Sequence, residues 1–214
     1  MLNVTGLEPR SDCVLCPRLA QFRADNRVLR PEFFNAPVPN FGQGGARLLI
    51  VGLAPGLKGA NRTGRPFTGD YAGDLLYDVL IQTGLATGLY DKRPDDGLTL
   101  ENCLITNAVR CVPPQNKPTP GEIRTCNGFL MATLDQGPNL RAILTLGRIA
   151  HEATLRALGD KPSAYKFAHG AVHTVGDLRM VNSYHCSRYN TQTGRLTRSM
   201  FIDAVNTAKK AAGL

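Results

Sequence analysis

The chain has 214 residues, 43% of them hydrophobic and 20% charged, which is the usual balance of a globular protein with one core. No apolar run approaches the length of a membrane span, and the first residues lack the pattern of a secretory signal. We therefore expect a cytoplasmic protein with no membrane contact. The net charge of +8 fits a polyanionic partner, and it fits a merely basic soluble protein equally well.

Short apolar strands alternate with helices along the chain. The β-like runs cover residues 48–51, 104–106, 142–146 and 180–182. The helix-like stretches cover residues 72–83, a segment that starts near Thr119, a segment after Gly147, and residues 196–212. This alternation predicts an α/β fold, a single domain over residues 1–214 with a largely parallel sheet.

Ligands of such folds bind beyond the carboxyl ends of the strands. Three segments of the chain lie at such ends. The turn Gly52–Gly56 follows the first strand, Asn107 ends the second, and His185 follows the last. We expect these segments to converge on one pocket.

Cysteines form a candidate metal site. Cys13 and Cys16 are closely spaced, and Cys111 and Cys126 follow with fourteen residues between them. Thiolates suit zinc or a four-iron cluster, and the proline-rich stretch 110–118 is typical of a loop that wraps a ligand. Four unrelated thiols are the alternative that this spacing leaves open. A disulfide framework is not expected in a cytosolic chain.

The segment from Gly52 to Asp70 carries the strongest local signal. Its glycine- and proline-fixed turn allows a ligand to approach the backbone closely. Three basic residues follow, Arg65 among them, and Phe67 lies among polar and small residues, where it can stack on a flat ligand. A phosphate loop of the NTPase type is excluded, because the pattern G-x-x-x-x-G-K-[ST] is absent.

A second segment, residues 182–197, is rich in hydroxyl and amide side chains and contains two arginines but no acid. Such a loop can bind phosphates and enter a DNA groove. An ordinary polar loop before a helix has the same composition, so this segment alone decides nothing.

Together the two segments resemble the uracil-DNA glycosylase superfamily, and within it the cluster-containing family 5 enzymes. The turn GLAPG, then ten residues, then Phe67 matches the family's first motif. Residues 185–197 match its C-terminal motif H-P-S-R-x-N-T-x-T-G-R-L-T, except that Cys186 replaces the proline. The cysteines are similar in order and spacing, so the resemblance covers nearly the whole chain.

The resemblance implies a central four-stranded parallel sheet with helices on both faces. It implies a [4Fe-4S] cluster on Cys13, Cys16, Cys111 and Cys126. The implied activity is that of a DNA repair glycosylase, which flips uracil or a related damaged base out of DNA and hydrolyses its N-glycosidic bond. We expect a monomer. A non-catalytic iron–sulfur protein that binds DNA is the alternative function.

The resemblance also assigns roles to single residues. Phe67 stacks on the base, Asn107 reads its edge, and His185 stabilises the charge on the departing base. The implied substrate-binding residues are Gly52, Ala54, Pro55, Gly56, Phe67, Asn107 and His185. The implied DNA-binding residues are Ser187, Arg188, Asn190, Thr191 and Arg195. Cys186 leaves this loop without its usual stiffening proline, which bears on substrate preference.

Asp70 is the third predicted catalytic residue, beside Asn107 and His185. Other branches of the superfamily place an Asp, Glu or Asn two residues after the first motif glycine, where this chain has Ala54. Alanine cannot orient water, and Asp70 is the nearest carboxylate of the motif. We expect Asp70 to position water, and also to cap the helix that begins near Tyr71.

Overall fold

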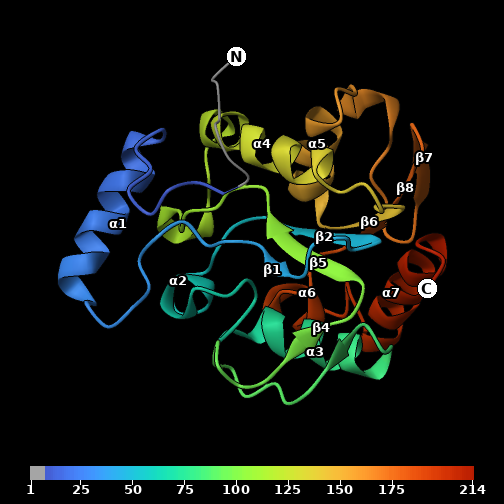
Figure 1. Ribbon diagram of the computed structural model, residues 1–214, viewed down its shortest axis with the longest axis horizontal. Coiled ribbons are helices and arrows are strands. Elements are labelled where there is room, and N and C mark those ends of the chain that lie inside the picture. The colour runs from blue at the N-terminus through green and yellow to red at the C-terminus, as the bar shows by residue number, and fades with distance from the viewer. Residues whose placement is uncertain (1–7) are drawn as a thin grey trace.

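A six-stranded sheet runs through the centre of the computed structural model, which describes residues 8–214 (Figure 1). In spatial order its strands are β1 (Phe41–Gly42), β5 (Cys103–Asn107), β2 (Leu48–Gly52), β6 (Ala142–Leu146), β8 (Leu178–Ser183) and β7 (Val172–Val175). The four inner strands are parallel, and β1 and β7 pair antiparallel to them at the two edges.

The predicted number of four strands is therefore wrong, although all four predicted strands are present as the inner ones. The edge strands escaped prediction for a physical reason. Strand β1 has only two residues, and β7 is largely exposed, with His173 and Thr174 between its valines. Neither gives the continuous apolar run that a strand covered on both faces shows.

Helices cover both faces of the sheet. The structure places α4 (Pro120–Asp135) and α5 (Arg148–Ala157) on one face, and α3 (Tyr71–Gln82) and α7 (Arg198–Ala211) on the other (Figure 1). The remaining elements are α1 (Pro17–Leu29), α2 (Ala60–Thr63), α6 (Arg188–Gln192), the 3-10 turns η1 (Pro114–Asn116) and η2 (Pro162–Ala164), and the small antiparallel pair β3 (Ala86–Thr87) and β4 (Thr99–Leu100).

Alternation along β2 divides the core between these two layers. Leu48 and Ile50 pack with the cluster that contains α3 and α7, whereas Leu49 and Val51 pack with the cluster that contains α4. Successive side chains of a strand point to opposite faces, so one apolar strand serves both layers. None of the helices in the described part of the chain has the length and apolarity that crossing a bilayer requires.

Capping residues set the helix starts that matter for the site. Asp70 caps α3, as predicted, and accepts a hydrogen bond from the backbone N–H of Gly73. Thr119 and Glu122 form a reciprocal capping box at α4, whose first residue is Pro120. The first turns of α3 and α4 are thus each stabilised by a side-chain cap.

Candidate active site

A cavity of about 280 Å³ opens beyond the carboxyl ends of the inner strands. It brings together eight predicted site residues: Ala54, Gly56, Phe67, Asp70, Asn107, His185, Ser187 and Arg188. Gly52 lies directly behind this cavity, whereas Pro55 and Thr191 are not among the residues that line it. Asn190 and Arg195 line a neighbouring cavity of about 340 Å³, which shares the His185 side chain with the first.

Gly52 makes room for two functional side chains. It is the register partner of Asn107 on the parallel strand β5. A Cβ on Gly52 would lie 2.5 Å from Cζ of Phe67 and would collide with Oδ1 of Asn107. Only glycine therefore lets the Phe67 ring and the Asn107 amide pack over the backbone here.

Asn107 presents an unsatisfied acceptor. Its side chain is 3% exposed, and its Oδ1 has no hydrogen-bond partner within residues 8–214. A buried polar atom without a partner costs free energy, so native structures rarely keep one without a reason. Because Asn107 lines the cavity, a ligand that carries an N–H group can satisfy this oxygen.

Phe67 and His185 form the aromatic part of the cavity wall. Their ring centroids are 5.9 Å apart and their planes differ by 28°. Burial lowers the pKa of His185 to about 4, so the imidazole is neutral at neutral pH. A neutral imidazole still carries one N–H, which can donate a hydrogen bond to a developing anion. The amide of Asn190 donates to the backbone oxygen of His185 at 2.8 Å and fixes this turn.

The Asp70 carboxylate has two different environments. Its Oδ1 accepts from the Gly73 N–H at 3.1 Å, which is the helix cap. Its Oδ2 faces the first motif, where a Cβ on Gly56 would approach to 3.0 Å and a Cβ on Gly59 would collide. Burial raises the pKa of Asp70 above its ordinary value, while hydrogen bonds from backbone N–H groups of α3 lower it. One oxygen thus caps the helix, and the other lies towards the turn of the first motif.

The loop after β8 is held by contacts within the protein. Ser187 caps α6 by accepting from the Asn190 N–H at 3.4 Å. Thr191 donates to the hydroxyl of Tyr71 at 3.0 Å, and the Arg188 guanidinium lies 5.4 Å from the centre of the Tyr71 ring. Arg188 itself is exposed, which leaves its charge free for a partner.

Comparison with known proteins places this arrangement in a family. The sequence model of the uracil DNA glycosylase superfamily matches residues 39–209. The chain is 48% identical over 208 residues to a type-5 uracil-DNA glycosylase of Thermus thermophilus, with 94% of each chain covered. The chain belongs to the uracil DNA glycosylase superfamily.

Other relatives agree with the type-5 resemblance. A type-5 uracil-DNA glycosylase of Mycobacterium tuberculosis is 42% identical over 216 residues, which cover 95% of this chain and 80% of the relative. A type-4 uracil-DNA glycosylase of Thermotoga maritima is 29% identical over 164 residues, or 76% of each chain. The family predicted from the two motifs and the cysteines is thereby confirmed.

The four cysteines predicted as ligands also converge in this superfamily member. Cys13, Cys16, Cys111 and Cys126 line one small cavity between α1 and α4. Arg23 donates to Sγ of Cys111 at 3.0 Å, and the backbone N–H of Arg110 donates to Sγ of Cys126 at 3.3 Å. No group of three or more His, Cys, Asp or Glu side chains within residues 8–214 is placed to hold a metal ion.

Leu53 also lines the cavity and belongs to the predicted turn, whereas four further lining residues were not predicted: Ala60, Tyr71, Ala72 and Asn116. Tyr71 was detectable as the first residue of the helix that Asp70 caps. Asn116 gave no signal, because it lies in the proline-rich loop, where both Gln115 and Asn116 have positive φ. That loop starts at Cys111 and ends in the cavity, so it connects the cysteine site to the active site.

Cys186, which replaces the motif proline, is fully buried. Its Sγ lies 3.4 Å from the backbone oxygen of Ala72, so the thiol ties the loop to the start of α3.

Proposed function

We propose that the chain is a DNA repair glycosylase that removes uracil from DNA by hydrolysing the N-glycosidic bond, leaving an abasic site. The observation that carries this proposal is the unpartnered Oδ1 of Asn107, buried beside Phe67 and His185. Uracil offers an N–H donor next to a carbonyl acceptor on the edge that an asparagine amide can read. Cytosine offers an acceptor next to an amino group, so it leaves the Asn107 oxygen unsatisfied in this orientation.

The substrate must first leave the double helix. A target base in a duplex is out of reach, so the nucleotide is flipped into the cavity at the cost of stacking and pairing. There the base stacks on Phe67, and the small side chains of Ala54, Gly56 and Ala60 leave the wall open. This open wall supports an activity on related deaminated or damaged bases as well as on uracil.

Bond cleavage separates charge between the sugar and the base. The bond between the sugar carbon and the base nitrogen breaks, and its electron pair leaves with uracil as an anion. His185 donates its N–H to the uracil oxygen where this charge collects, and Asn107 holds the other edge. Water adds to the cationic sugar carbon, and the proton that it loses passes to solvent and neutralises the released uracil anion. The free oxygen of Asp70 positions that water and stabilises the positive sugar.

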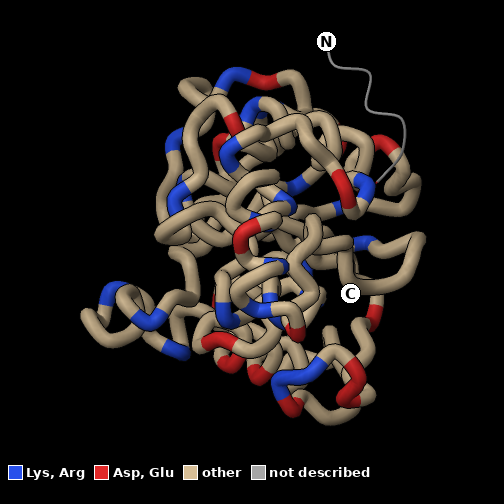
Figure 2. Tube along the Cα trace, turned by 90° about the vertical axis from the view of Figure 1, so that its left-hand side faces the viewer, with Lys and Arg blue, Asp and Glu red and all other residues tan. Residues whose placement is uncertain are grey.

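The loop after β8 is proposed to contact the DNA. Ser187 and Arg188 border the cavity and face the incoming strand. Arg195 lies 4.5 Å from the centre of the Tyr184 ring and is exposed, so it can reach a phosphate. Asn190 and Thr191 support the loop through His185 and Tyr71. Lysine and arginine residues are spread along the trace rather than gathered on one element (Figure 2).

We further propose that Cys13, Cys16, Cys111 and Cys126 hold a [4Fe-4S] cluster. Their convergence on one cavity, the two N–H···S bonds and the all-sulfur donor set support it. Thiols that surround a cavity without meeting at one point would suit a cluster of several iron atoms better than a single ion. Glycosidic hydrolysis moves no electrons, so the cluster would supply structure by joining α1, the proline-rich loop and α4.

The test is a duplex with one uracil, incubated with the protein and then treated with alkali. We expect strand cleavage at the uracil, and none at a cytosine in the same position. The Asn107→Ala variant is the control, because it lacks the amide that hydrogen-bonds to the uracil edge. Tight binding of the uracil duplex without any alkali-labile site would favour the non-catalytic DNA-binding alternative.

A further inference from the structure

Phe67 has a backbone conformation that needs support. Its φ of +54° lies in the left-handed region, which bulky residues rarely adopt. The conformation is useful, because it turns the ring onto Gly52 and next to Asn107. A strained segment of this kind persists only when the surrounding structure over-determines it. The contacts on both sides of Phe67 are therefore informative.

Two tyrosine hydroxyls hold the backbone around Phe67. Tyr77 donates to the backbone oxygen of Pro66 at 2.6 Å. Tyr90 donates to the backbone oxygen of Phe67 at 3.3 Å and accepts from the N–H of Gly69 at 3.3 Å. The peptide groups before and after the strained residue are thus each fixed by a side chain from outside the segment.

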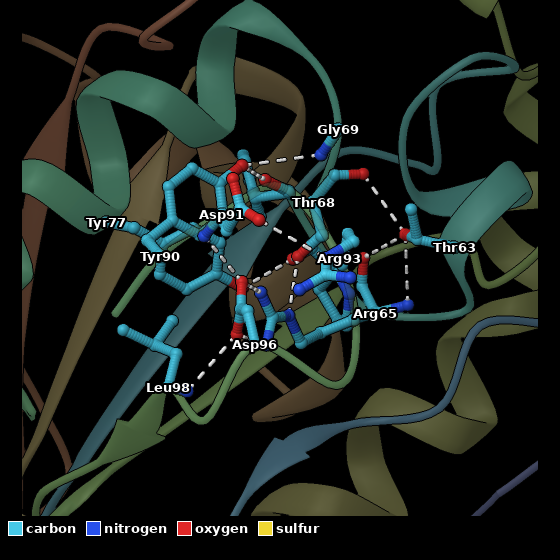
Figure 3. Close-up of polar contacts among 12 residues, drawn as sticks. Thr63, Arg65, Thr68, Gly69, Tyr77, Tyr90, Asp91, Arg93, Asp96 and Leu98 are labelled. Carbon is cyan, nitrogen blue, oxygen red and sulfur yellow. Dashed lines mark hydrogen bonds and ion pairs between the residues drawn. The ribbon is translucent and has the colours of Figure 1, made fainter. Parts of the chain in front are cut away.

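A buried ion pair lies beneath these tyrosines (Figure 3). Arg65 is 4% exposed and donates two hydrogen bonds of 2.8 Å to Asp96. Its Nε donates to Oγ1 of Thr68 at 2.7 Å. Its guanidinium also lies 5.4 Å and 5.8 Å from the ring centres of Tyr77 and Tyr90. Because these contacts bury and pair its guanidinium, Arg65 is not available to DNA.

Asp96 joins this pair to the loop that carries Tyr90. Its two oxygens also accept from the backbone N–H groups of Asp91 and Leu98, at 2.9 Å and 3.1 Å. Burial alone would raise the pKa of Asp96, but the hydrogen bonds from Arg65 and these amides outweigh it and lower that pKa. The carboxylate stays charged and keeps the Tyr90 loop in place.

We propose that Arg65, Asp96, Tyr77 and Tyr90 are positioning residues that hold the segment from Phe67 to Asp70 in its reactive geometry. None of the four lines the active-site cavity. A buried ion pair is a poor source of stability, because desolvation offsets its attraction. Its use here is to fix one conformation of the neighbouring segment. This inference rests on the proposed function, in which Phe67 stacks on the base and Asp70 positions water.

Tyr90→Phe is the sharpest variant, because it removes one hydroxyl and keeps the ring over Arg65. Tyr165→Phe is the matched control, since its ring packs on His173 away from this cluster. Asp96→Asn removes the buried charge, and Asp78→Asn breaks the exposed pair with Arg198 as its control. If Asp96→Asn fails to fold, Tyr90→Phe still tests the positioning role.

The first readout separates chemistry from binding. We expect Tyr90→Phe to slow single-turnover excision roughly 10-fold, as a small misplacement of a reacting group does. Affinity for DNA with an abasic-site analogue should stay near the parental value. In a background that carries both Phe67→Ala and Asp70→Asn, Tyr90→Phe should cause no further slowing, because its effect passes through these two residues. A merely structural role would slow both backgrounds alike.

The second readout needs no substrate. Hydrogen exchange of the Gly69 amide should be faster in Tyr90→Phe and unchanged in Tyr165→Phe. Parental excision rates in Tyr90→Phe, or equal slowing in the parental protein and in the Phe67→Ala and Asp70→Asn background, would overturn the inference. A parental protein that cuts no uracil would instead contradict the proposed function, and Gly69 exchange would then decide the positioning role, with an unchanged rate refuting it.

Discussion

The rings of Phe67 and His185 lie side by side, with centroids 5.9 Å apart and planes inclined by 28°. This spacing is too small for a base to enter between them. In the proposed mechanism the flipped pyrimidine therefore stacks on Phe67 from the cavity side, and His185 meets its edge. The proposal gives the two residues separate tasks, because Phe67 holds the base and His185 stabilises it as it leaves.

His185→Gln should slow single-turnover excision by roughly 100- to 1000-fold, the usual loss when a donor to a developing anion is removed. Asn107→Ala should slow excision at least as much as any change at Asp70, because Asn107 also binds the leaving base. His173→Gln, on the exposed edge strand β7, is the control and should keep the parental rate. A His185→Gln variant within a factor of about two of the parent would remove His185 from the mechanism.

The pH dependence of stability follows from the same histidine. Burial lowers the pKa of His185 from 6.5 to about 4, so below pH 6.5 the unfolded chain binds a proton that the folded protein does not. This contribution destabilises the folded protein progressively as the pH falls from 6.5 towards 4. Urea unfolding should show the parent losing about 2 kcal/mol more than His185→Gln between pH 7 and pH 5. An equal loss of unfolding free energy in both proteins would contradict the lowered pKa of His185.

Asp70 is predicted to act through charge as well as capping. Asparagine caps a helix as well as aspartate does, so Asp70→Asn isolates the charge. We expect excision to slow about 10- to 100-fold with little change in melting temperature. Thr197→Ala, which removes the cap of α7, controls for loss of a cap alone. If Asp70→Asn and Asp70→Ala both cleave at the parental rate, Asp70 is only a cap.

Much of the site was predictable because parallel strands end at one edge of the sheet. Apolar runs located β2, β5, β6 and β8, and this placed Gly52, Asn107 and His185 together before any contact was known. The cap at Asp70 was predictable because aspartate before a helical pattern favours that role. These inferences needed only local sequence and one rule of topology.

Other features depend on tertiary contacts that local sequence does not contain. The buried partner of Arg65 is Asp96, which is 31 residues away, so the local sequence does not show that the charge of Arg65 is neutralised. Helix α1 was missed because it is mainly polar, with Arg23 and Asn26 among its buried residues. Asn116 reaches the cavity only through the path of an irregular loop.

The proposed cluster predicts that only four of the cysteines are needed for visible absorbance and bound iron. Cys13, Cys16, Cys111 or Cys126 changed to Ser should each lose most of the visible absorbance and iron, because one missing thiolate opens the site. Cys103→Ser should keep the colour, since Cys103 is buried against Leu85 elsewhere in the fold. Full absorbance in Cys126→Ser would refute the ligand set, and zinc in the parental protein would refute the cluster.

Phosphate contacts by the loop after β8 should appear in the salt dependence of DNA binding. Arg188→Ala and Arg195→Ala should each weaken binding to any sequence and reduce the slope of log K against log salt by about 0.9. Arg156→Ala is the control, because Arg156 lies at the far end of α5 and pairs with Glu152. Unchanged slopes in both loop variants would mean that this loop does not touch the backbone.

The most direct test of the account is the product released from a duplex with a single uracil at saturating protein. Mass spectrometry should detect free uracil and a DNA strand that carries an abasic site but remains unbroken before alkali. The same protein should release no cytosine from the matched duplex, and Asn107→Ala should release uracil far more slowly. Stable binding of the uracil duplex with every N-glycosidic bond intact would contradict the central claim that Asn107 and His185 stabilise a departing base.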